Sequence, residues 1–280
     1  LIWEYVDRYS SPCILVVNQI DHEKSDFNQT LQQAQNRFGR NVLPIQYPLN
    51  QGPDFNTIVD ALRMTMYVFD DDGGKPEKVP IPDSEIKRAQ EMHNALVEAA
   101  AENDEELMER FFDHGSLNED ELARGLHIAL KNQEIFPVFC CSGLRNMGSG
   151  RVMGFINDIA PSPADRQPAP LENGDTLLCD PQDDTTIFIY KTMSEPQVGN
   201  VSYFKTYSGV LNSSDELINK QTGISERFNQ IYVSNGKNRE QTNRIVAGDI
   251  GVTVKLKKSH TNNTLNSKDI DRAVEPMHFH

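Results

Sequence analysis

Two short apolar runs stand out in the first half of the chain. Residues 12–17 read P-C-I-L-V-V and residues 135–141 read I-F-P-V-F-C-C. Continuous apolar runs of this length predict strands buried on both faces, as in a parallel sheet covered by helices. Apolar residues spaced three or four apart predict helices over residues 24–38 and 152–159. The first half therefore has the pattern of an α/β domain.

The stretch between these two strands is acidic and helical in spacing. Residues 83–121 contain thirteen acids and three bases, and their apolar positions recur every three or four residues. Asn103 and Asn118 are each followed three residues later by Glu, which is the pattern of a capping box at a helix start. We expect an α-helical insert over residues 46–133 that interrupts the α/β domain.

The pattern changes after a proline-rich stretch at residues 161–170, whose composition is typical of a stiff linker between domains. Beyond it, short segments rich in Ile, Val, Tyr, Phe and Thr alternate with turns that contain Gly and Asn. This pattern predicts an all-β barrel. We therefore expect an α/β domain over residues 1–160, a barrel over 161–268 and the beginning of a third domain over 269–280.

Composition and charge exclude several classes of function. The chain has 280 residues with 41 acids and 27 bases, and the formal charge of −14 argues against DNA as a partner. No apolar run approaches the roughly 20 residues that cross a bilayer, so no membrane partner is expected. The four cysteines lack a C-x-x-C spacing and the seven histidines lack a ligand pattern, so we expect a reduced, cytoplasmic protein without a metal site.

Polar side chains follow both buried strands. Asn18 and Asp21 come directly after the first, and Ser142 and Gly143 come directly after the second. Ligands of open α/β sheets collect at the carboxyl ends of strands, and an ionised Asp could accept both edge hydrogens of guanine, a pair that adenine lacks. Either motif alone is more typical of a plain turn or helix cap. Their occurrence after two buried strands of one domain favours a guanine site.

These motifs resemble those of the translational GTPases, and most closely those of elongation factor G. Residues 16–21, V-V-N-Q-I-D, are similar to the family's N-K-x-D motif, and residues 141–144, C-S-G-L, to its S-A-[LF] loop. In the predicted barrel, residues 207–212 (Y-S-G-V-L-N) and 247–251 (A-G-D-I-G) resemble the family's second domain. Residues 275–279 resemble the beginning of its third domain.

The resemblance implies a fold and a ligand. The fold is an α/β remnant of a P-loop GTPase domain with an α-helical insert, followed by an all-β translation-factor barrel. The ligand is GTP or GDP, and Gln19, which stands where the family has Lys, would lie over the base. The residues that the resemblance assigns to the guanine pocket are Asn18, Gln19, Asp21, Ser142, Gly143 and Leu144.

The resemblance also implies an activity and partners for the full-length protein. It would bind the ribosome through rRNA and ribosomal proteins, contact the stalk protein through the acidic insert, and move tRNA and mRNA with GTP. The 280 residues hold no G-x-x-x-x-G-K-[ST] phosphate loop and no switch segments, so this piece should not hydrolyse GTP, and Mg²⁺ would bind only in the full-length protein. The alternative is a noncatalytic or divergent ribosome-binding paralogue with a vestigial guanine site.

Overall fold

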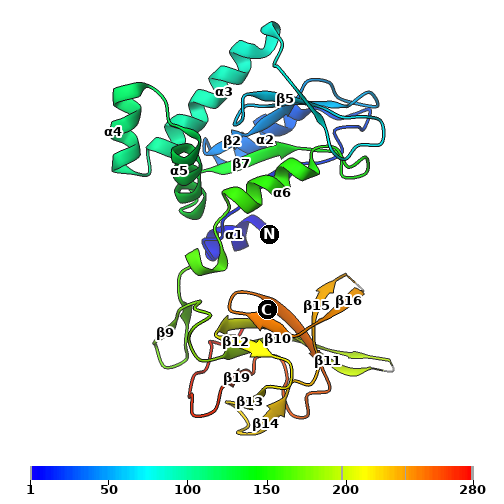
Figure 1. The fold of residues 1–280 in the computed structure, drawn as a ribbon, viewed down its shortest axis with the longest axis vertical. Coiled ribbons are helices and arrows are strands. Elements are labelled where there is room, and N and C mark those ends of the chain that lie inside the picture. The colour runs from blue at the N-terminus through cyan, green and yellow to red at the C-terminus, as the bar shows by residue number, and fades with distance from the viewer. Residues whose placement is uncertain (1, 197, 237, 279–280) are drawn as a thin grey trace. The chain divides into compact units, whose positions relative to one another are not determined.

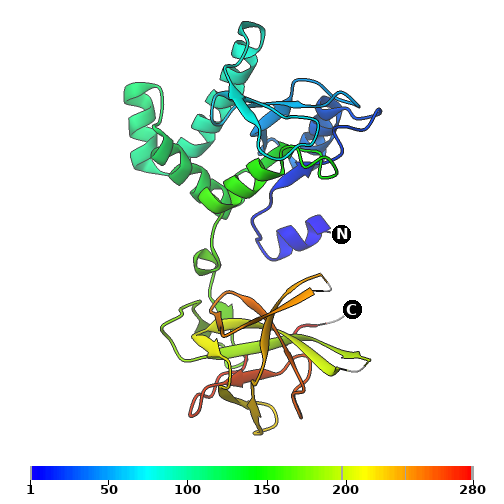
Figure 2. The same cartoon turned by 45° about the vertical axis from the view of Figure 1, so that its right-hand side comes forward.

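The computed structural model describes residues 2–196, 198–236 and 238–278. The chain divides into two compact units, Leu1–Pro161 and Ser162–His280 (Figures 1 and 2). The division lies at the beginning of the proline-rich stretch, where fixed φ angles and missing N–H donors prevent a helix or a central strand from continuing. Each unit has its own hydrophobic clusters.

The first unit is built on a three-stranded parallel sheet with the order β1-β7-β2. Its strands are β1 (Leu15–Val17), β7 (Phe136–Cys140) and β2 (Val42–Pro44). Val17 pairs with Cys140, and Pro44 pairs with Val138. Both strands predicted from the apolar runs are therefore present, and they are direct neighbours. The helices outside the insert are α1 (Ile2–Arg8), α2 (Phe27–Phe38) and α6 (Ser149–Asp158).

The central strand β7 is buried at every position because each face of the sheet is covered. Val138 and Cys140 belong to one hydrophobic cluster, which includes Phe27 of α2. Phe139, between them in sequence, belongs to a second cluster with Phe155 of α6. Successive side chains of a strand point to opposite faces, so β7 connects the two halves of the core. This arrangement explains why residues 135–141 show no polar alternation.

The predicted helical insert over residues 46–133 is wrong in its first part, which folds as a four-stranded antiparallel sheet. The strands, in the order β3-β4-β5-β6, are β3 (Gln46–Pro48), β4 (Thr57–Asp60), β5 (Thr65–Val68) and β6 (Glu77–Val79). All four residues of β4 are buried, so the strand lacks the alternation that identifies a half-exposed strand in sequence. Helices begin only at Asp83.

The acidic stretch forms three helices, α3 (Asp83–Ala101), α4 (Glu105–His114) and α5 (Glu119–Lys131). The capping box at Asn118 is confirmed, since its side chain accepts from the N–H of Glu121 at 2.9 Å. The predicted cap at Asn103 is wrong by one residue. Asp104 caps α4 by accepting from the Leu107 N–H, because the Asn103 amide donates back to the Ala99 carbonyl instead.

The second unit contains a curled antiparallel sheet of eight strands in the order β14-β13-β19-β10-β11-β18-β15-β16 (Figure 1). Their bounds are β10 (Thr186–Glu195), β11 (Gly199–Ser208), β13 (Glu216–Asn219), β14 (Ser225–Arg227), β15 (Ile231–Asn235), β16 (Asn238–Thr242), β18 (Ile250–Val254) and β19 (Thr264–Asn266). Two small ribbons join β8 (Ala169–Pro170) to β9 (Thr176–Leu177) and β12 (Val210–Asn212) to β17 (Arg244–Val246). The hydrophobic core of this unit contains Ile187, Phe204 and Phe228. The all-β fold predicted from the sequence is therefore present.

The described residues after 268 pack on the second unit. Val274 is buried in a cluster with Leu171 and Phe188, and its segment forms a bridge to Leu171. Arg272 forms an ion pair with Asp183 at 2.9 Å. Whether residues 269–280 also begin a third domain stays a prediction, and residues 279 and 280 lie outside the described residues.

Helices α3 and α5 pack so closely that a glycine is required between them. A Cβ at Gly125 would lie 2.5 Å from the Ala100 carbonyl oxygen, whereas a Cβ at Gly154 in α6 would meet only a guanidinium nitrogen of Arg151 at 3.6 Å. We expect Gly125→Ala to lower the free energy of unfolding by about 1–3 kcal/mol through overpacking. Gly154→Ala should raise it by about 0.5–1 kcal/mol through helix propensity. Urea unfolding of both variants checks the opposite signs, and equal effects would contradict this packing.

Candidate functional site

The loops that follow β1 and β7 lie side by side at the carboxyl edge of the parallel sheet. The N–H of Cys141 donates to the Val17 carbonyl at 3.0 Å, which extends the β1–β7 pairing by one residue. The N–H of Ile20 then donates to the Cys141 carbonyl at 3.3 Å. Two segments more than 120 positions apart in sequence thus form one surface.

The Asn18 side chain joins these two loops directly. Its Oδ1 accepts from the Gly143 N–H at 2.9 Å and from the Cys141 thiol at 3.5 Å. Its amide NH₂ donates to no group within residues 2–196, 198–236 and 238–278, and the residue is exposed. The structure therefore brings Asn18 and Gly143 together and leaves two amide hydrogens of Asn18 available to a ligand.

The Asp21 carboxylate is half-buried and makes no hydrogen bond or ion pair with any described residue. Ile20 beside it is 1% exposed and anchors the loop in the core. Asp21 follows Ile20, whose N–H donates to the Cys141 carbonyl, so the backbone brings Asp21 next to the second loop. Burial raises the pKa of the Cys141 thiol, and the charge of Asp21 raises it further. The Asp21 carboxylate, which can only accept hydrogen bonds, thus lies near the Asn18–Gly143 hydrogen bond and has no partner among the described residues.

Gln19 has a left-handed backbone with φ of 64°, an unusual conformation for a residue other than glycine. The His22 N–H donates to the Gln19 carbonyl at 3.0 Å and closes a tight turn. The Ser25 hydroxyl donates to the Ile20 carbonyl at 2.7 Å and fixes the other side of this turn. The Gln19 side chain is exposed. The loop is thus held by backbone contacts, and its polar side chains remain on the surface.

In the loop after β7, the groups that could contact a ligand are mostly backbone groups. Ser142 is fully buried, its hydroxyl accepts from the Arg145 N–H at 3.1 Å, and its backbone forms two hydrogen bonds with Met147. The Ser142 hydroxyl therefore shapes the turn and does not face a ligand. Gly143 offers its N–H to Asn18, and Leu144 follows with a side chain that is 90% exposed.

Sequence reasoning missed Arg145, which fixes this loop from outside the motif. Its Nη1 donates to the carbonyls of Pro53 and Phe55, each at 3.0 Å. The loop after β7 is thereby attached to the segment before β4, which also contacts Ile20, since the Gly52 N–H donates to the Ile20 carbonyl at 2.9 Å. An arginine directly after the S-G-L tripeptide was the available signal. Its carbonyl partners lie 90 and 92 positions away, so only the fold identifies them.

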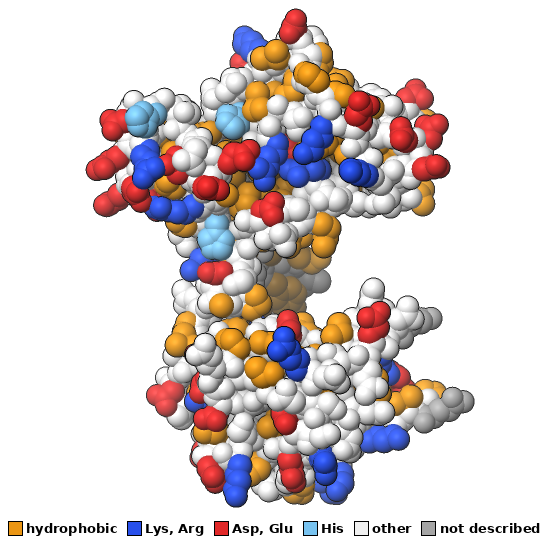
Figure 3. All heavy atoms as spheres, viewed as in Figure 1, with side chains coloured by type: hydrophobic (Ala, Val, Ile, Leu, Met, Phe, Trp, Pro, Cys, Tyr) orange, Lys and Arg blue, Asp and Glu red, His pale blue; other side chains and the backbone are white. Residues whose placement is uncertain are grey.

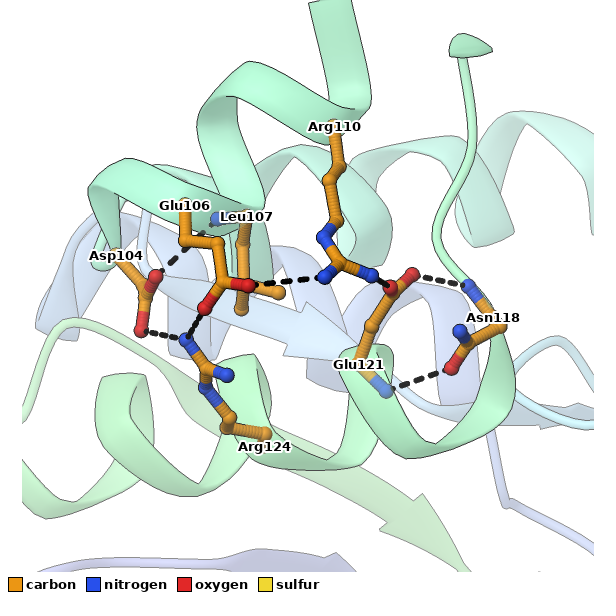
Figure 4. A network of polar contacts seen from close by, with 7 residues as sticks. All are labelled: Asp104, Glu106, Leu107, Arg110, Asn118, Glu121 and Arg124. Carbon is orange, nitrogen blue, oxygen red and sulfur yellow. Dashed lines mark hydrogen bonds and ion pairs between the residues drawn. The ribbon is translucent and has the colours of Figure 1, made fainter. Parts of the chain in front are cut away.

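A second candidate surface is the acidic helical pair α4–α5, which holds a network of five charged side chains (Figure 4). Arg124 contacts Asp104 at 2.6 Å and Glu106 at 2.9 Å. Arg110 contacts Glu106 at 2.9 Å and also Glu121. Two arginines thus neutralise three acids. The acids of α4 and α5 that have no basic partner among the described residues are exposed: Glu105, Glu109, Asp113 and Asp120. Red side chains are frequent on this part of the surface (Figure 3).

This network lowers the pKa of its carboxyl groups. Hydrogen bonds from Arg124 hold the pKa of Asp104 and of Glu106 below the usual values. The pKa of Glu121 is lowered first by the Asn118 N–H and then by Arg110. All three side chains lie at the solvent-exposed surface of the helices, so salt screens these interactions. The acids remain ionised at neutral pH, and the surface keeps its negative charge.

The described part of the chain holds neither a candidate metal-binding group nor a candidate membrane-spanning helix. Residues 2–196, 198–236 and 238–278 hold no group of three or more His, Cys, Asp or Glu side chains that could bind a metal ion. Within the same ranges, no helix combines the length and the apolar character needed to cross a bilayer. The polar groups that remain to be explained are therefore those of the two loops and of the helical surface.

Comparison with known proteins finds a family match in the second unit. Residues 184–268 match the family model described as elongation factor G domain 2. The second unit is therefore similar to that domain. The match covers strands β10 to β19, so the resemblance inferred from residues 207–212 and 247–251 is confirmed for this domain.

The fold of the whole chain is similar to that of a solved relative. A crystal structure of a protein from Thermus thermophilus matches 96% of this chain with a TM-score of 0.80 and 24% sequence identity. This chain spans 38% of the length of that protein. At this identity the likeness establishes the fold alone, and it confirms an α/β unit followed by an all-β unit.

In the second unit the two motifs that carry the resemblance contact each other. The N–H of Ala247 donates to the Gly209 carbonyl at 2.9 Å, and the N–H of Gly248 donates to the Thr206 carbonyl at 2.8 Å. Gly209 has φ of +70°, and a Cβ there would lie 2.6 Å from Thr185. The glycine is therefore required by both conformation and close approach. This contact joins the β11–β12 turn to the loop before β18.

The Asn18 bridge generates a paired prediction. Asn18→Ala should lower the free energy of unfolding by about 1 kcal/mol, because the Gly143 N–H loses its acceptor. Gly143→Ala should change it by less than about 0.5 kcal/mol, because the added Cβ would lie 3.4 Å from Asn18 Oδ1 in ordinary contact and the backbone needs no positive φ. Urea unfolding checks both, and a larger loss in Gly143→Ala would contradict the loop geometry.

The acidic network generates a prediction about pH. We expect Arg124→Gln to raise the pKa of both Asp104 and Glu106, which carboxyl carbon NMR measures directly. A lowered pKa stabilises the folded state above the ordinary carboxyl pKa, and this contribution disappears as pH falls through the lowered value. When the pH is lowered, the stabilisation of the α4–α5 contact should therefore decrease more in the wild type than in Arg124→Gln. Arg37→Gln on α2 is the control and should leave both pKa values unchanged.

Proposed function

We propose that the chain is part of a translational GTPase that binds GTP or GDP at the loops after β1 and β7. The observation that carries this proposal is the Asn18–Gly143 hydrogen bond, which holds the two loops together beside the unpartnered Asp21 carboxylate. The match of the second unit to elongation factor G domain 2 supports the same family for the whole chain.

The chemistry of the site suits guanine. Asp21 accepts two hydrogen bonds from the N1 and exocyclic N2 groups of guanine, and adenine does not present this pair. The free NH₂ of Asn18 donates to the N7 and O6 edge of the base. Gln19 lies over one face of the base, and the backbone of Ser142, Gly143 and Leu144 closes the pocket near O6. In this arrangement one carboxylate provides most of the discrimination between the purines.

Hydrolysis and movement on the ribosome belong to the full-length protein in this proposal. The 280 residues contain no phosphate loop that would hold the β- and γ-phosphates or Mg²⁺, so the chain by itself binds nucleotide only through the base. A protein as long as the Thermus relative has room for the missing part. There, GTP binding and hydrolysis with Mg²⁺ would drive translocation of tRNA and mRNA.

The proposed partner is the ribosome in the cytoplasm. The exposed acids of α4 and α5 offer a surface for a ribosomal protein, and the stalk protein is the partner that the family resemblance suggests. Domain 2 carries a local excess of bases over residues 235–272, which suits contact with rRNA phosphates. Residue 237 of this stretch lies outside the described residues.

A second candidate is a noncatalytic ribosome-binding paralogue, and Gln19 is the observation that favours it. An amide at this position keeps part of the aliphatic stem of Lys but lacks its charge near the ribose and phosphates. Titration of the full-length protein with a fluorescent GDP analogue and a ribosome-stimulated GTPase assay separate the two. Nucleotide binding with multiple turnover supports the GTPase, whereas binding without turnover supports the paralogue.

Asp21 is the residue whose change tests guanine selection. We expect Asp21→Asn in the full-length protein to weaken GDP binding about 10- to 100-fold and to reduce its preference over ADP, because one charged acceptor becomes a donor. Competition titrations with GDP and ADP measure both quantities. Glu23→Gln, which removes the same charge from the same loop, is the matched control. An unchanged GDP preference in Asp21→Asn would refute the guanine site.

A further inference from the structure

A polar cavity of about 420 Å³ in the first unit takes no part in the nucleotide site described above. Its lining residues are Arg63, Thr65, Tyr67, Lys78, Glu119 and Arg151. Three of these six side chains are cationic and one is acidic. The chain as a whole has a formal charge of −14, so a concave surface with an excess of bases contrasts with the rest of the protein. Lys and Arg side chains also gather on the face of this unit seen in Figure 3.

The floor of the cavity is formed by the antiparallel pair β5–β6. Tyr67 and Lys78 are directly opposite each other in this pair, so their side chains lie on the same face. Thr65 precedes Tyr67 by two residues and shares that face. Arg151 comes from the first turn of α6 and Arg63 from the turn between β4 and β5. The cavity is therefore formed by the β3–β6 sheet, in a region where the sequence predicted helices.

Arg151 is held in place by a buried acid. Its Nε and Nη2 both contact Asp60 Oδ2, at 2.9 and 2.8 Å, and Asp60 is fully buried. The guanidinium carbon lies 5.2 Å from the centre of the Tyr67 ring. A guanidinium has five N–H groups, and these contacts use two of them. The remaining donors of a fixed cation stay available at the cavity wall.

Two further lining groups have no internal partner. Tyr67 is 3% exposed, yet its hydroxyl makes no hydrogen bond with any residue in the described ranges. Burial raises the pKa of this phenol, which keeps it protonated and able to donate. The Lys78 ammonium forms no ion pair within the same ranges. Since Tyr67 lines the cavity, its hydroxyl is open to water there and is available to a ligand.

The acid at the rim does not block the cavity. Glu119 lies 3.4 Å from Arg63, and its side chain is 82% exposed. Asp158 lies 3.5 Å from the same guanidinium. Both separations are long for a charge-assisted hydrogen bond. An incoming anion can therefore displace Glu119 into solvent and take its place beside Arg63.

We propose that this cavity binds a phosphate group, carried by a small phosphorylated molecule or by a nucleic-acid backbone. The free donors of Arg151, Tyr67 and Lys78 come from three elements, and the terminal oxygens of a phosphate group can accept from them. A phosphate monoester offers three such oxygens and up to two charges, and a backbone phosphodiester offers two oxygens and one charge. The volume leaves space for the group to which the phosphate is attached. This site is independent of the guanine site, since the two share no residue.

Titration calorimetry on the 280-residue chain tests the proposal with two probes, inorganic pyrophosphate and a ten-nucleotide oligouridine. We expect Tyr67→Phe and Lys78→Gln each to weaken binding about tenfold, the loss of one hydrogen bond to a charged group. Tyr67→Phe keeps the ring beside Arg151 and removes a hydroxyl without a partner, so the thermal midpoint should not fall. Glu119→Gln should strengthen binding about threefold, because it removes the competing charge.

Lys131→Gln is the matched control for the loss of charge, since Lys131 ends α5 about 18 Å from Glu119 along the helix axis. It should bind both probes as the wild type does, and so should Asp21→Asn. Pyrophosphate binding that responds to Tyr67→Phe and Lys78→Gln supports a small phosphorylated ligand. The same response with oligouridine alone supports a nucleic-acid backbone. Equal affinity of these variants and Lys131→Gln, or no binding of either probe at about 1 mM, would overturn the proposal.

Discussion

The first unit depends on the parallel pairing of β1 with β7. This pairing places the ends of two strands, Val17 and Cys140, at the same edge of the sheet. The hydrogen bond from the Gly143 N–H to Asn18 then joins the loops that follow. Without this register the polar residues after the two strands would be unrelated turns. The candidate nucleotide site is therefore a consequence of strand pairing, and its side chains add chemistry to an edge that the backbone has already built.

Burial on both faces of β7 is the constraint that organises the surrounding elements. Phe139 faces one cluster and Val138 the other, so helices and a second sheet must cover both sides. The four strands β3 to β6 supply part of that cover, with Ile58 and Tyr67 in the first cluster. Tyr67 also lines the polar cavity, so the cavity borders the first cluster at this ring. One insert thus contributes both to the core and to a surface with its own chemistry.

Polar groups in this protein divide into those that the fold satisfies and those that it leaves available. Glu226 is 2% exposed, and it accepts from the backbone N–H groups of Lys257 and Lys258 and from the Ser259 hydroxyl, so it has a structural role in the second unit. Asp21 and the Tyr67 hydroxyl have no such partners among the described residues. Polar groups at the surface that lack a protein partner are available to water or to a ligand.

The sequence by itself determined the two buried strands, the helices near them, the all-β second unit and the polar residues that follow the two strands, because apolar periodicity and short motifs are local. Only the tertiary structure decided that residues 46–79 form a sheet, since β4 is buried throughout and shows no alternation. It also decided that Asn18 contacts Gly143, that Arg145 fixes the second loop, and that Asp60 holds Arg151 at a cavity. Each of these contacts joins segments about 90 or more positions apart, and the local pattern of a sequence does not encode such distances.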